Sequence, residues 1–249
     1  AVAATDAAGN VGNDGSADEL TIDTTPPTVT VTALTTNDTT PALTGSIDDT
    51  TATVQVTVDG QVLAATNNGD GTWTLADGSL AALAEGTYNV AVAATDAAGN
   101  VGNDGSAGEF TIDTTPPAVT VDGLTTNDTT PELTGTIDDT TATVQVTVDG
   151  QVLAATNNGD GTWTLADGSL TALAEGTYNV AVAATDAAGN VGNDASADEL
   201  VVDTTPPAVT VGALITNDTT PALTGTVDDT AATIQVTVDG QVLVATNNG

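Results

Sequence analysis

Hydrophobic and polar residues alternate along short stretches of the chain, and each stretch is bounded by residues that favour turns. Within residues 53–59, for example, Val54, Val56 and Val58 alternate with polar neighbours. A period of two is typical of β-strands that bury one face. Between residues 25 and 114 the pattern predicts strands at 28–34, 42–47, 53–59, 61–66, 72–76, 86–95 and 107–113.

Turn residues and the near absence of helical patterns indicate the fold class. Asp59-Gly60 is a hairpin signal between two predicted strands, and only the Ala-rich residues 80–85 suggest a single helical turn. Seven short strands in a unit of this size are typical of an immunoglobulin-like sandwich. Tyr88 fits either a tyrosine corner of that fold or an ordinary core position. The sequence therefore predicts an all-β chain of tandem immunoglobulin-like β-sandwich domains.

The chain repeats itself with a period of 90 residues. AVAATDAAGNVGND begins at Ala1, Ala91 and Ala181, and residues 25–114 differ from residues 115–204 at 11 of 90 positions. The best boundary is the recurring Thr-Thr-Pro-Pro sequence, because two adjacent prolines cannot donate to a sheet and stiffen the chain. We expect a window of a longer protein, in which residues 1–24 end one repeat, 25–114 and 115–204 are complete repeats, and 205–249 begin another.

Charge changes the picture, because the chain has 34 Asp and Glu residues but no Lys, Arg, His or Cys. A formal net charge of -34 repels nucleic acid and anionic membranes, which are bound through basic residues. No apolar run approaches the roughly 18 residues that span a membrane, so we also expect no membrane insertion. Such acidity can indicate disorder, but 39% of the residues are hydrophobic and follow strand patterns, which favours a folded chain.

The acidic residues gather where the predicted topology places one end of each sandwich, beside the linker from the preceding repeat. Calcium prefers about six to eight oxygen ligands, whereas zinc and copper favour the His and Cys that are missing. The alternative is that these residues are solvated turn formers. From the other side of the junction, Asn37 and Asp38 are expected to approach the following repeat. The candidate calcium ligands are Asp6, Asn10, Asp23, Asp48, Asp49, Asp96, Asn100, Asp113, Asp138, Asp139, Asp186, Asn190, Asp203, Asp228 and Asp229.

The motifs ATDAAGN, IDTTPP, TNDTTP and LTGSIDD occur along the chain. Together they resemble bacterial immunoglobulin-like repeats of giant biofilm-associated and repeats-in-toxin (RTX) surface adhesins, and the resemblance covers the whole chain. It implies extender modules on the bacterial cell surface, type I secretion, and calcium that stiffens the junctions. The implied calcium positions are the linker Asp, the Asp pair such as Asp48 and Asp49, and the DAAGN loop of each repeat.

Near-identity of the repeats predicts a structural stalk, because a binding or catalytic site usually needs one distinctive set of residues. We expect a non-catalytic segment of an extracellular adhesin that serves cell adhesion and biofilm formation. Its partners are then the neighbouring repeats of the same chain, and other copies or cell-surface ligands through domains outside this window. Two alternatives stay open: a repeated ligand-binding module, which exposed Trp73 and Trp163 would favour, and a fibre subunit joined by strand addition.

Overall fold

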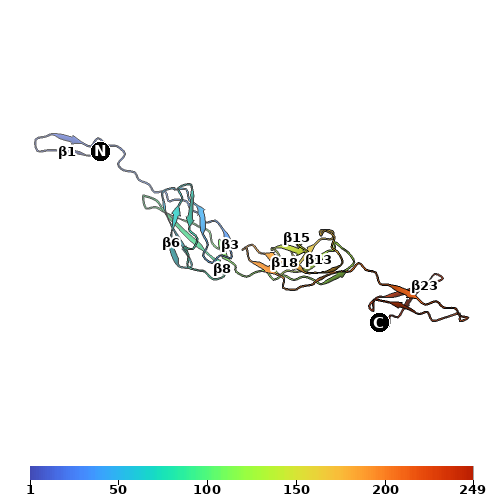
Figure 1. Ribbon diagram of the computed structural model, residues 1–249. Helices are drawn as coiled ribbons and strands as arrows, with labels where there is room; N and C mark the ends of the chain where they lie inside the picture. Colours follow the sequence, from blue (N-terminus) through green and yellow to red (C-terminus); the bar gives the residue numbers. More distant parts are fainter. Residues whose placement is uncertain (249) are drawn as a thin grey trace.

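The computed structural model describes residues 1–248, which form strands and loops. A hairpin, two β-sandwiches and a further group of strands follow one another along an extended chain (Figure 1). The described residues contain no helix, and so none that is long and apolar enough to cross a membrane. The predicted all-β class is confirmed.

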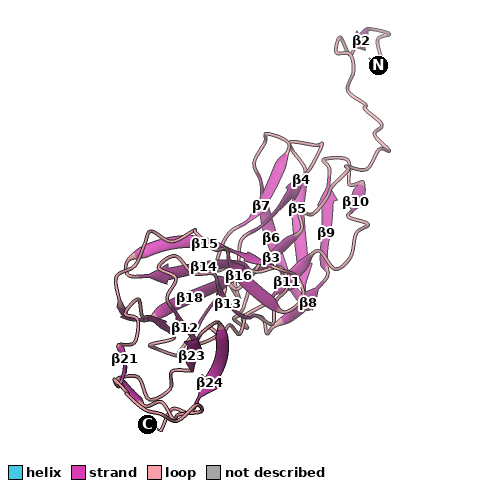
Figure 2. Ribbon diagram, turned by 90° about the vertical axis from the view of Figure 1, so that its right-hand side faces the viewer, coloured by secondary structure: helices cyan, strands magenta, loops and turns pink. Residues whose placement is uncertain are grey.

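Each sandwich is built from a six-stranded and a three-stranded sheet (Figure 2). In the first sandwich the orders are β10-β9-β5-β6-β7-β4 and β3-β11-β8, and the second sandwich repeats both orders. Neighbouring strands are antiparallel except β3 and β11, and their counterparts β12 and β20, which are parallel. The strands of the first sandwich are β3 (Leu34–Thr36), β4 (Leu43–Ser46), β5 (Thr53–Val58), β6 (Gln61–Asn67), β7 (Thr72–Leu75), β8 (Gly86–Tyr88), β9 (Val90–Thr95), β10 (Val101–Asn103) and β11 (Phe110–Ile112). Those of the second are β12 (Leu124–Thr126), β13 (Leu133–Thr136), β14 (Thr143–Val148), β15 (Gln151–Asn157), β16 (Thr162–Leu165), β17 (Gly176–Tyr178), β18 (Val180–Thr185), β19 (Val191–Asn193) and β20 (Leu200–Val202).

Three predicted strands differ from the structure, and two of them, at 86–95 and 28–34, differ because the chain passes from one sheet to the other. The strand predicted at 86–95 is divided into β8, which pairs with β11, and β9, which pairs with β5. The one predicted at 107–113 is shortened to β11, and β10 forms in a stretch predicted to be loop. Instead of a strand over 28–34, the structure has an isolated bridge between Val29 and Ile47, followed by β3.

The single helical turn suggested for residues 80–85 is wrong. The segment is an irregular loop, in which the backbone N–H of Leu83 donates to the carbonyl oxygen of Thr39 at 3.0 Å. The side chains of Leu80 and Leu83 are buried in the core of the sandwich. Burial of these two leucines, together with a hydrogen bond to the loop before β4, replaces the local bonds that a helix would make.

A tryptophan lies at the centre of each core and makes one specific hydrogen bond. Trp73 is fully buried, and its Nε1–H donates to the carbonyl oxygen of Thr30 at 2.8 Å. Gly45 lies against the indole, and a Cβ added there would be 1.9 Å from Thr30 O and 2.6 Å from Trp73 Nε1. Trp163 is buried in the same way. Neither tryptophan is exposed, and exposure is what would have favoured the ligand-binding alternative.

The hydroxyl of Tyr88 decides between the two interpretations of this residue. It donates to the carbonyl oxygen of Ala84 at 2.8 Å, and Tyr178 donates to Ala174 at 2.9 Å. Tyr88 lies near the start of the stretch predicted as one strand at 86–95, at the end of β8. A tyrosine at this place that bonds the backbone a few residues upstream is the tyrosine corner of immunoglobulin-like sandwiches. The ring also contacts Phe110, with the two centroids 5.9 Å apart.

Shorter strand pairs lie on either side of the two sandwiches. The hairpin of β1 (Ala3–Thr5) and β2 (Val11–Asn13) stands away from the first sandwich in both views (Figures 1 and 2). Toward the C-terminus, two strand pairs follow the second sandwich, and Gly249, the last residue of the predicted part 205–249, lies outside the described residues. The pairs are β21 (Val209–Val211) with β22 (Gly225–Val227), and β23 (Ile234–Val238) with β24 (Gln241–Ala245).

Candidate cation site between repeats

The loops that carry the predicted ligands meet at one end of each sandwich. In the first sandwich, the backbone N–H of Thr28 donates to Asp48 Oδ1 at 2.7 Å, which ties the loop after β4 to the start of the repeat. The side chain of Asn100, in the loop after β9, donates to the carbonyl oxygen of Asp23 in the preceding linker at 3.1 Å. The predicted topology therefore places these loops and the linker correctly.

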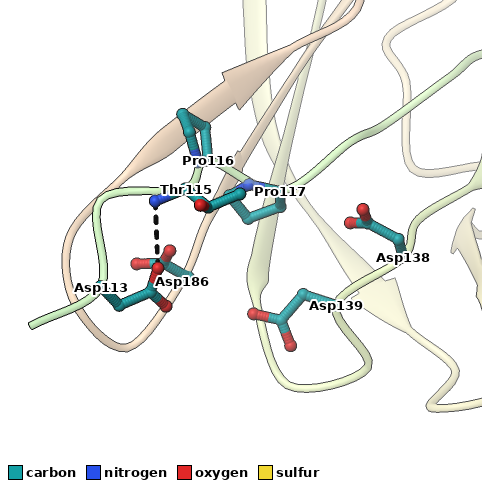
Figure 3. A pocket seen from close by; sticks show the side chains of 7 residues that line it. All are labelled: Asp113, Thr115, Pro116, Pro117, Asp138, Asp139 and Asp186. Carbon is teal, nitrogen blue, oxygen red and sulfur yellow. Dashed lines mark hydrogen bonds between the residues drawn. The ribbon is translucent and has the colours of Figure 1, made fainter. Parts of the chain in front are cut away.

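At the junction between the two sandwiches, four carboxylates line an open pocket of about 320 Å³ (Figure 3). They come from three segments: the linker, the loop after β13 and the loop after β18. Since the chain has no Lys, Arg or His, no basic side chain neutralises them. The lining residues are Asp113, Thr115, Pro116, Pro117, Asp138, Asp139 and Asp186.

Three of these carboxylates are fixed through one oxygen only. The described residues donate no hydrogen bond to the second oxygen, Oδ2, of any of the three, so it is available to a cation. The bonds to Oδ1 come from the backbone N–H of Thr115 to Asp113 at 3.0 Å, of Ala118 to Asp138 at 2.8 Å, and of Thr141 to Asp139 at 2.7 Å. The hydroxyl of Thr141 also donates to Asp139 Oδ1, at 2.8 Å.

The fourth carboxylate, Asp186, is held by its own DAAGN loop. Its Oδ1 accepts the backbone N–H groups of Ala188 and Asn190 at 2.9 Å, and its Oδ2 accepts the side chain of Asn190 at 2.8 Å. Desolvation raises the pKa of Asp186, but these hydrogen bonds outweigh it and hold the pKa below the ordinary value of 3.8. Asn190 also donates to the carbonyl oxygen of Asp113 at 2.8 Å, which joins the loop to the linker.

A sequence profile described as a bacterial Ig-like domain matches residues 29–114 and 119–204. The chain belongs to this family. A comparison with curated protein sequences gives no match.

Several solved structures resemble the two Ig-like repeats. Fibronectin(III)-like modules of CbhA from Clostridium thermocellum are 15% identical, with 70% of this chain and 93% of that chain covered and a TM-score of 0.42. A Ca²⁺-stabilized adhesin that helps an Antarctic bacterium bind ice is 24% identical, with coverage of 98% and 69% and a TM-score of 0.39. A tetra-tandem repeat from the extending region of a large adhesion protein is 27% identical, with coverage of 98% and 68% and a TM-score of 0.34.

The other candidate ligands lie at equivalent positions of the neighbouring Ig-like repeats. Asp6 and Asn10 bond each other at 2.8 Å in the hairpin loop between β1 and β2. Among residues 1–248, no group of three or more acidic side chains is placed to hold a metal ion as it stands. The ligand roles therefore stay predictions. Asp23, Asp48, Asp49, Asp96 and Asn100 belong to the junction before the first sandwich, and Asp203, Asp228 and Asp229 to the one after the second.

Glu85 is a junction residue that the sequence analysis missed. Its Oε2 accepts hydrogen bonds from the hydroxyl groups of Thr114 at 3.0 Å and Thr115 at 2.9 Å. These bonds attach the linker to the Ig-like repeat that precedes it. These bonds hold the pKa of the Glu85 carboxyl below its ordinary value of 4.5. Glu175 bonds the next linker in the same way. Recurrence of this glutamate after 90 residues was the only available signal, and it did not distinguish Glu85 from other repeated acids.

The loop between β3 and β4, residues 37–42, also reaches the following Ig-like repeat, as its predicted position at the far end of the sandwich requires. The backbone N–H of Asn37 donates to the carbonyl oxygen of Ala188 at 3.0 Å, which confirms the expectation for Asn37. Among residues 1–248, no hydrogen bond joins Asp38 to the following repeat. Its Oδ1 accepts the backbone N–H of Thr40 at 2.8 Å and so closes its own loop.

Proposed function

We propose that the chain is an extender segment of a large secreted or cell-surface bacterial adhesin, which holds other domains away from the cell and so serves adhesion and biofilm formation. The observation that carries this proposal is the end-to-end arrangement of nearly identical Ig-like repeats, which differ at 11 of 90 positions (Figure 1). Every loop of one full repeat recurs in the next, so an added repeat contributes length rather than a new site.

Calcium is the cation that we propose for the junction pocket. Its four carboxylates are hard oxygen donors of the kind that calcium prefers, and three of them have an Oδ2 without a hydrogen-bond donor. Asp113 belongs to the linker, whereas Asp138, Asp139 and Asp186 belong to the loops of the second sandwich. An ion shared among them would reduce their mutual repulsion and stiffen the connection between the linker and that sandwich.

Two other functions, a repeated ligand-binding module and catalysis, have less support. Exposed aromatic anchors would favour a repeated ligand-binding module, but Trp73 and Trp163 are fully buried. A catalytic role is also disfavoured, because the chain has no His, Cys, Lys or Arg to serve as base, nucleophile or charge stabiliser. We therefore propose a mechanical rather than a chemical role.

Calorimetric titration of the chelator-treated chain with Ca²⁺ tests the cation proposal. Asp138→Asn removes one negative charge from the pocket but keeps an oxygen for the N–H of Ala118. Asp149→Asn makes the same charge change in the turn after β14, where the backbone is already left-handed with φ of 49°. We expect calcium binding with at least one ion per junction, weakened at one site by Asp138→Asn and unchanged by Asp149→Asn.

Thermal melts in calcium and in chelator provide the second measurement. At a free concentration about 100-fold above the dissociation constant, an ion that binds only the folded state stabilises it by about 2.7 kcal/mol. Absence of both binding heat and a melting shift would refute the calcium proposal. Equal weakening by Asp138→Asn and Asp149→Asn would instead place the ion outside the pocket.

A further inference from the structure

A direct contact joins the two sandwiches beside the acidic pocket. The backbone N–H of Asn37, in the loop after β3, donates to Ala188 O at 3.0 Å, in the DAAGN loop of the next repeat. Gly189 lies next to it, so that an added Cβ would be 3.8 Å from Asn37 Nδ2. Its φ of 92° favours glycine at this point of the loop. Protein atoms alone make this contact.

The two copies of the DAAGN loop show what the contact does. Residues 91–104 and 181–194 are identical in sequence, but only the second copy has a complete preceding sandwich beside it. There Ala188 is 8% exposed and Asn190 is 7% exposed. In the first copy, Ala98 is exposed and Asn100 is half-buried. The neighbouring repeat, and not the loop sequence, therefore accounts for the burial of Ala188.

We propose that the loop between β3 and β4, residues 37–42, is a docking surface for the DAAGN loop of the next repeat, and that this contact sets the direction of successive repeats without a bound cation. Both partners recur along the chain: TNDTTP begins at Thr36, Thr126 and Thr216, and DAAGN begins at Asp6, Asp96 and Asp186. Calcium then tightens a junction that the protein has already oriented.

Glu85 holds the linker from the same side as the docking loop. Its bonds to Thr114 and Thr115 fix the segment between the two sandwiches, while Asn37 fixes the loop of the second sandwich. Two attachment points at different places restrict rotation about the linker more than one does. The docked junction has therefore a defined direction rather than the freedom of a flexible tether.

The absence of cysteine makes a distance measurement straightforward. Val62→Cys and Val152→Cys place one spin label on each sandwich, at equivalent positions that are 56% and 57% exposed. Pulsed electron paramagnetic resonance in chelator then gives the distribution of distances between the sandwiches. We expect a single narrow distribution in the absence of calcium.

Ala188→Gln replaces the buried methyl group with a long polar side chain, and Ala98→Gln is the matched change in the exposed copy. We expect Ala188→Gln to broaden the distribution, with a fall of about fivefold in the ratio of docked to undocked chains, as for the loss of one hydrogen bond. Ala98→Gln should leave it unchanged. A broad distribution in the chain without either substitution, or equal broadening by both, would overturn the docking surface.

A second pair of variants removes the donor itself. Asn37→Pro lacks the backbone N–H that reaches Ala188, whereas Asn127→Pro makes the same change in a loop whose following repeat has no DAAGN loop within the 249 residues. Melting curves with both sandwich transitions intact show that each variant is folded. Broadening by Asn37→Pro alone supports docking, and equal widths for the two contradict it. A narrow distribution in a chain that binds no calcium would refute the cation proposal but keep the docking surface.

Discussion

Gly45 provides a sharp test of how the core is built, because any side chain at this position collides with a buried hydrogen bond. A Cβ at residue 45 would lie 1.9 Å from Thr30 O and 2.6 Å from Trp73 Nε1. These two atoms are the acceptor and donor of the 2.8 Å bond at the centre of the core. In Gly45→Ala the indole has to move away, and its N–H loses the partner that it has in the folded chain.

The cost has two parts. A buried donor without a partner costs about 1–3 kcal/mol, and an extra methyl group in a packed core costs about 1–3 kcal/mol more. Replacement of glycine restricts the unfolded chain and returns about 0.4–1 kcal/mol. We therefore expect a net loss of about 1–6 kcal/mol in the unfolding free energy of the first sandwich. For a domain of this size, each kcal/mol lowers the melting temperature by about 4–8 °C.

Circular-dichroism melts measure this loss, and the second sandwich in the same chain is the internal reference. Gly105→Ala is the matched control, because an added Cβ there meets no atom within 4 Å and the second repeat already has Ala195 at this position. We expect the melting temperature of the first sandwich to fall in Gly45→Ala and to stay the same or rise slightly in Gly105→Ala. Equal melting of the two variants would refute the account of the Trp73 contact.

Two further predictions concern hydrogen bonds to the loops. Because the pKa of Asp186 is lowered in the folded chain, its contribution to stability is full above the ordinary value of 3.8 and is lost as the pH falls through the lowered pKa. The difference in unfolding free energy between the wild-type chain and Asp186→Asn should therefore be constant near neutral pH and shrink in acid, and a difference independent of pH would contradict this origin. Tyr88→Phe should remove about 1 kcal/mol by loss of the bond to Ala84 O, which melting curves can measure with Tyr178→Phe as an independent copy. No loss in either variant would show that the corner bond contributes nothing to stability.

The alternation of hydrophobic and polar residues identified most strands and the side chains that face the core, because this pattern depends only on which side of a strand is exposed to solvent. Trp73 and Val56 are buried as their positions in the pattern require. The same reasoning failed at Asn89, between β8 and β9, where the chain changes sheets. Sheet pairing depends on residues far away in the sequence, so a local pattern does not report it.

The candidate site was predictable to the level of loops. Topology placed Asp113, Asp138 and Asp186 at one junction, and these residues line one pocket. The sequence did not reveal the role of Glu85, because this carboxylate accepts hydrogen bonds from the hydroxyl groups of Thr114 and Thr115. Threonine is not part of the recurring Asp and Asn pattern that predicted the junction. Which carboxylate oxygens are occupied by backbone N–H groups is likewise a property of the folded loops.

Near-identity of adjacent repeats creates a risk of misassembly during folding. The strands β9 and β18 have the same sequence, VAVAAT. During folding, β5 could therefore pair with β18 of the neighbouring sandwich instead of with β9. Val58 pairs with Val90, and pairing with Val180 instead would close a loop about fourfold longer at a cost of only about 1 kcal/mol. Exchange of strands between adjacent units is a typical failure of repeat proteins.

The last strand of each sandwich opposes this exchange. In β11 and β20 all three residues differ, with FTI in the first sandwich and LVV in the second. Phe110 and Leu200 are both buried, so a swapped closing strand would put a ring where a smaller side chain fits, or leave a void. Misfits of this kind cost about 1–3 kcal/mol each. The three substitutions between β11 and β20 thus favour pairing of each closing strand within its own sandwich, although most of the two repeats is identical.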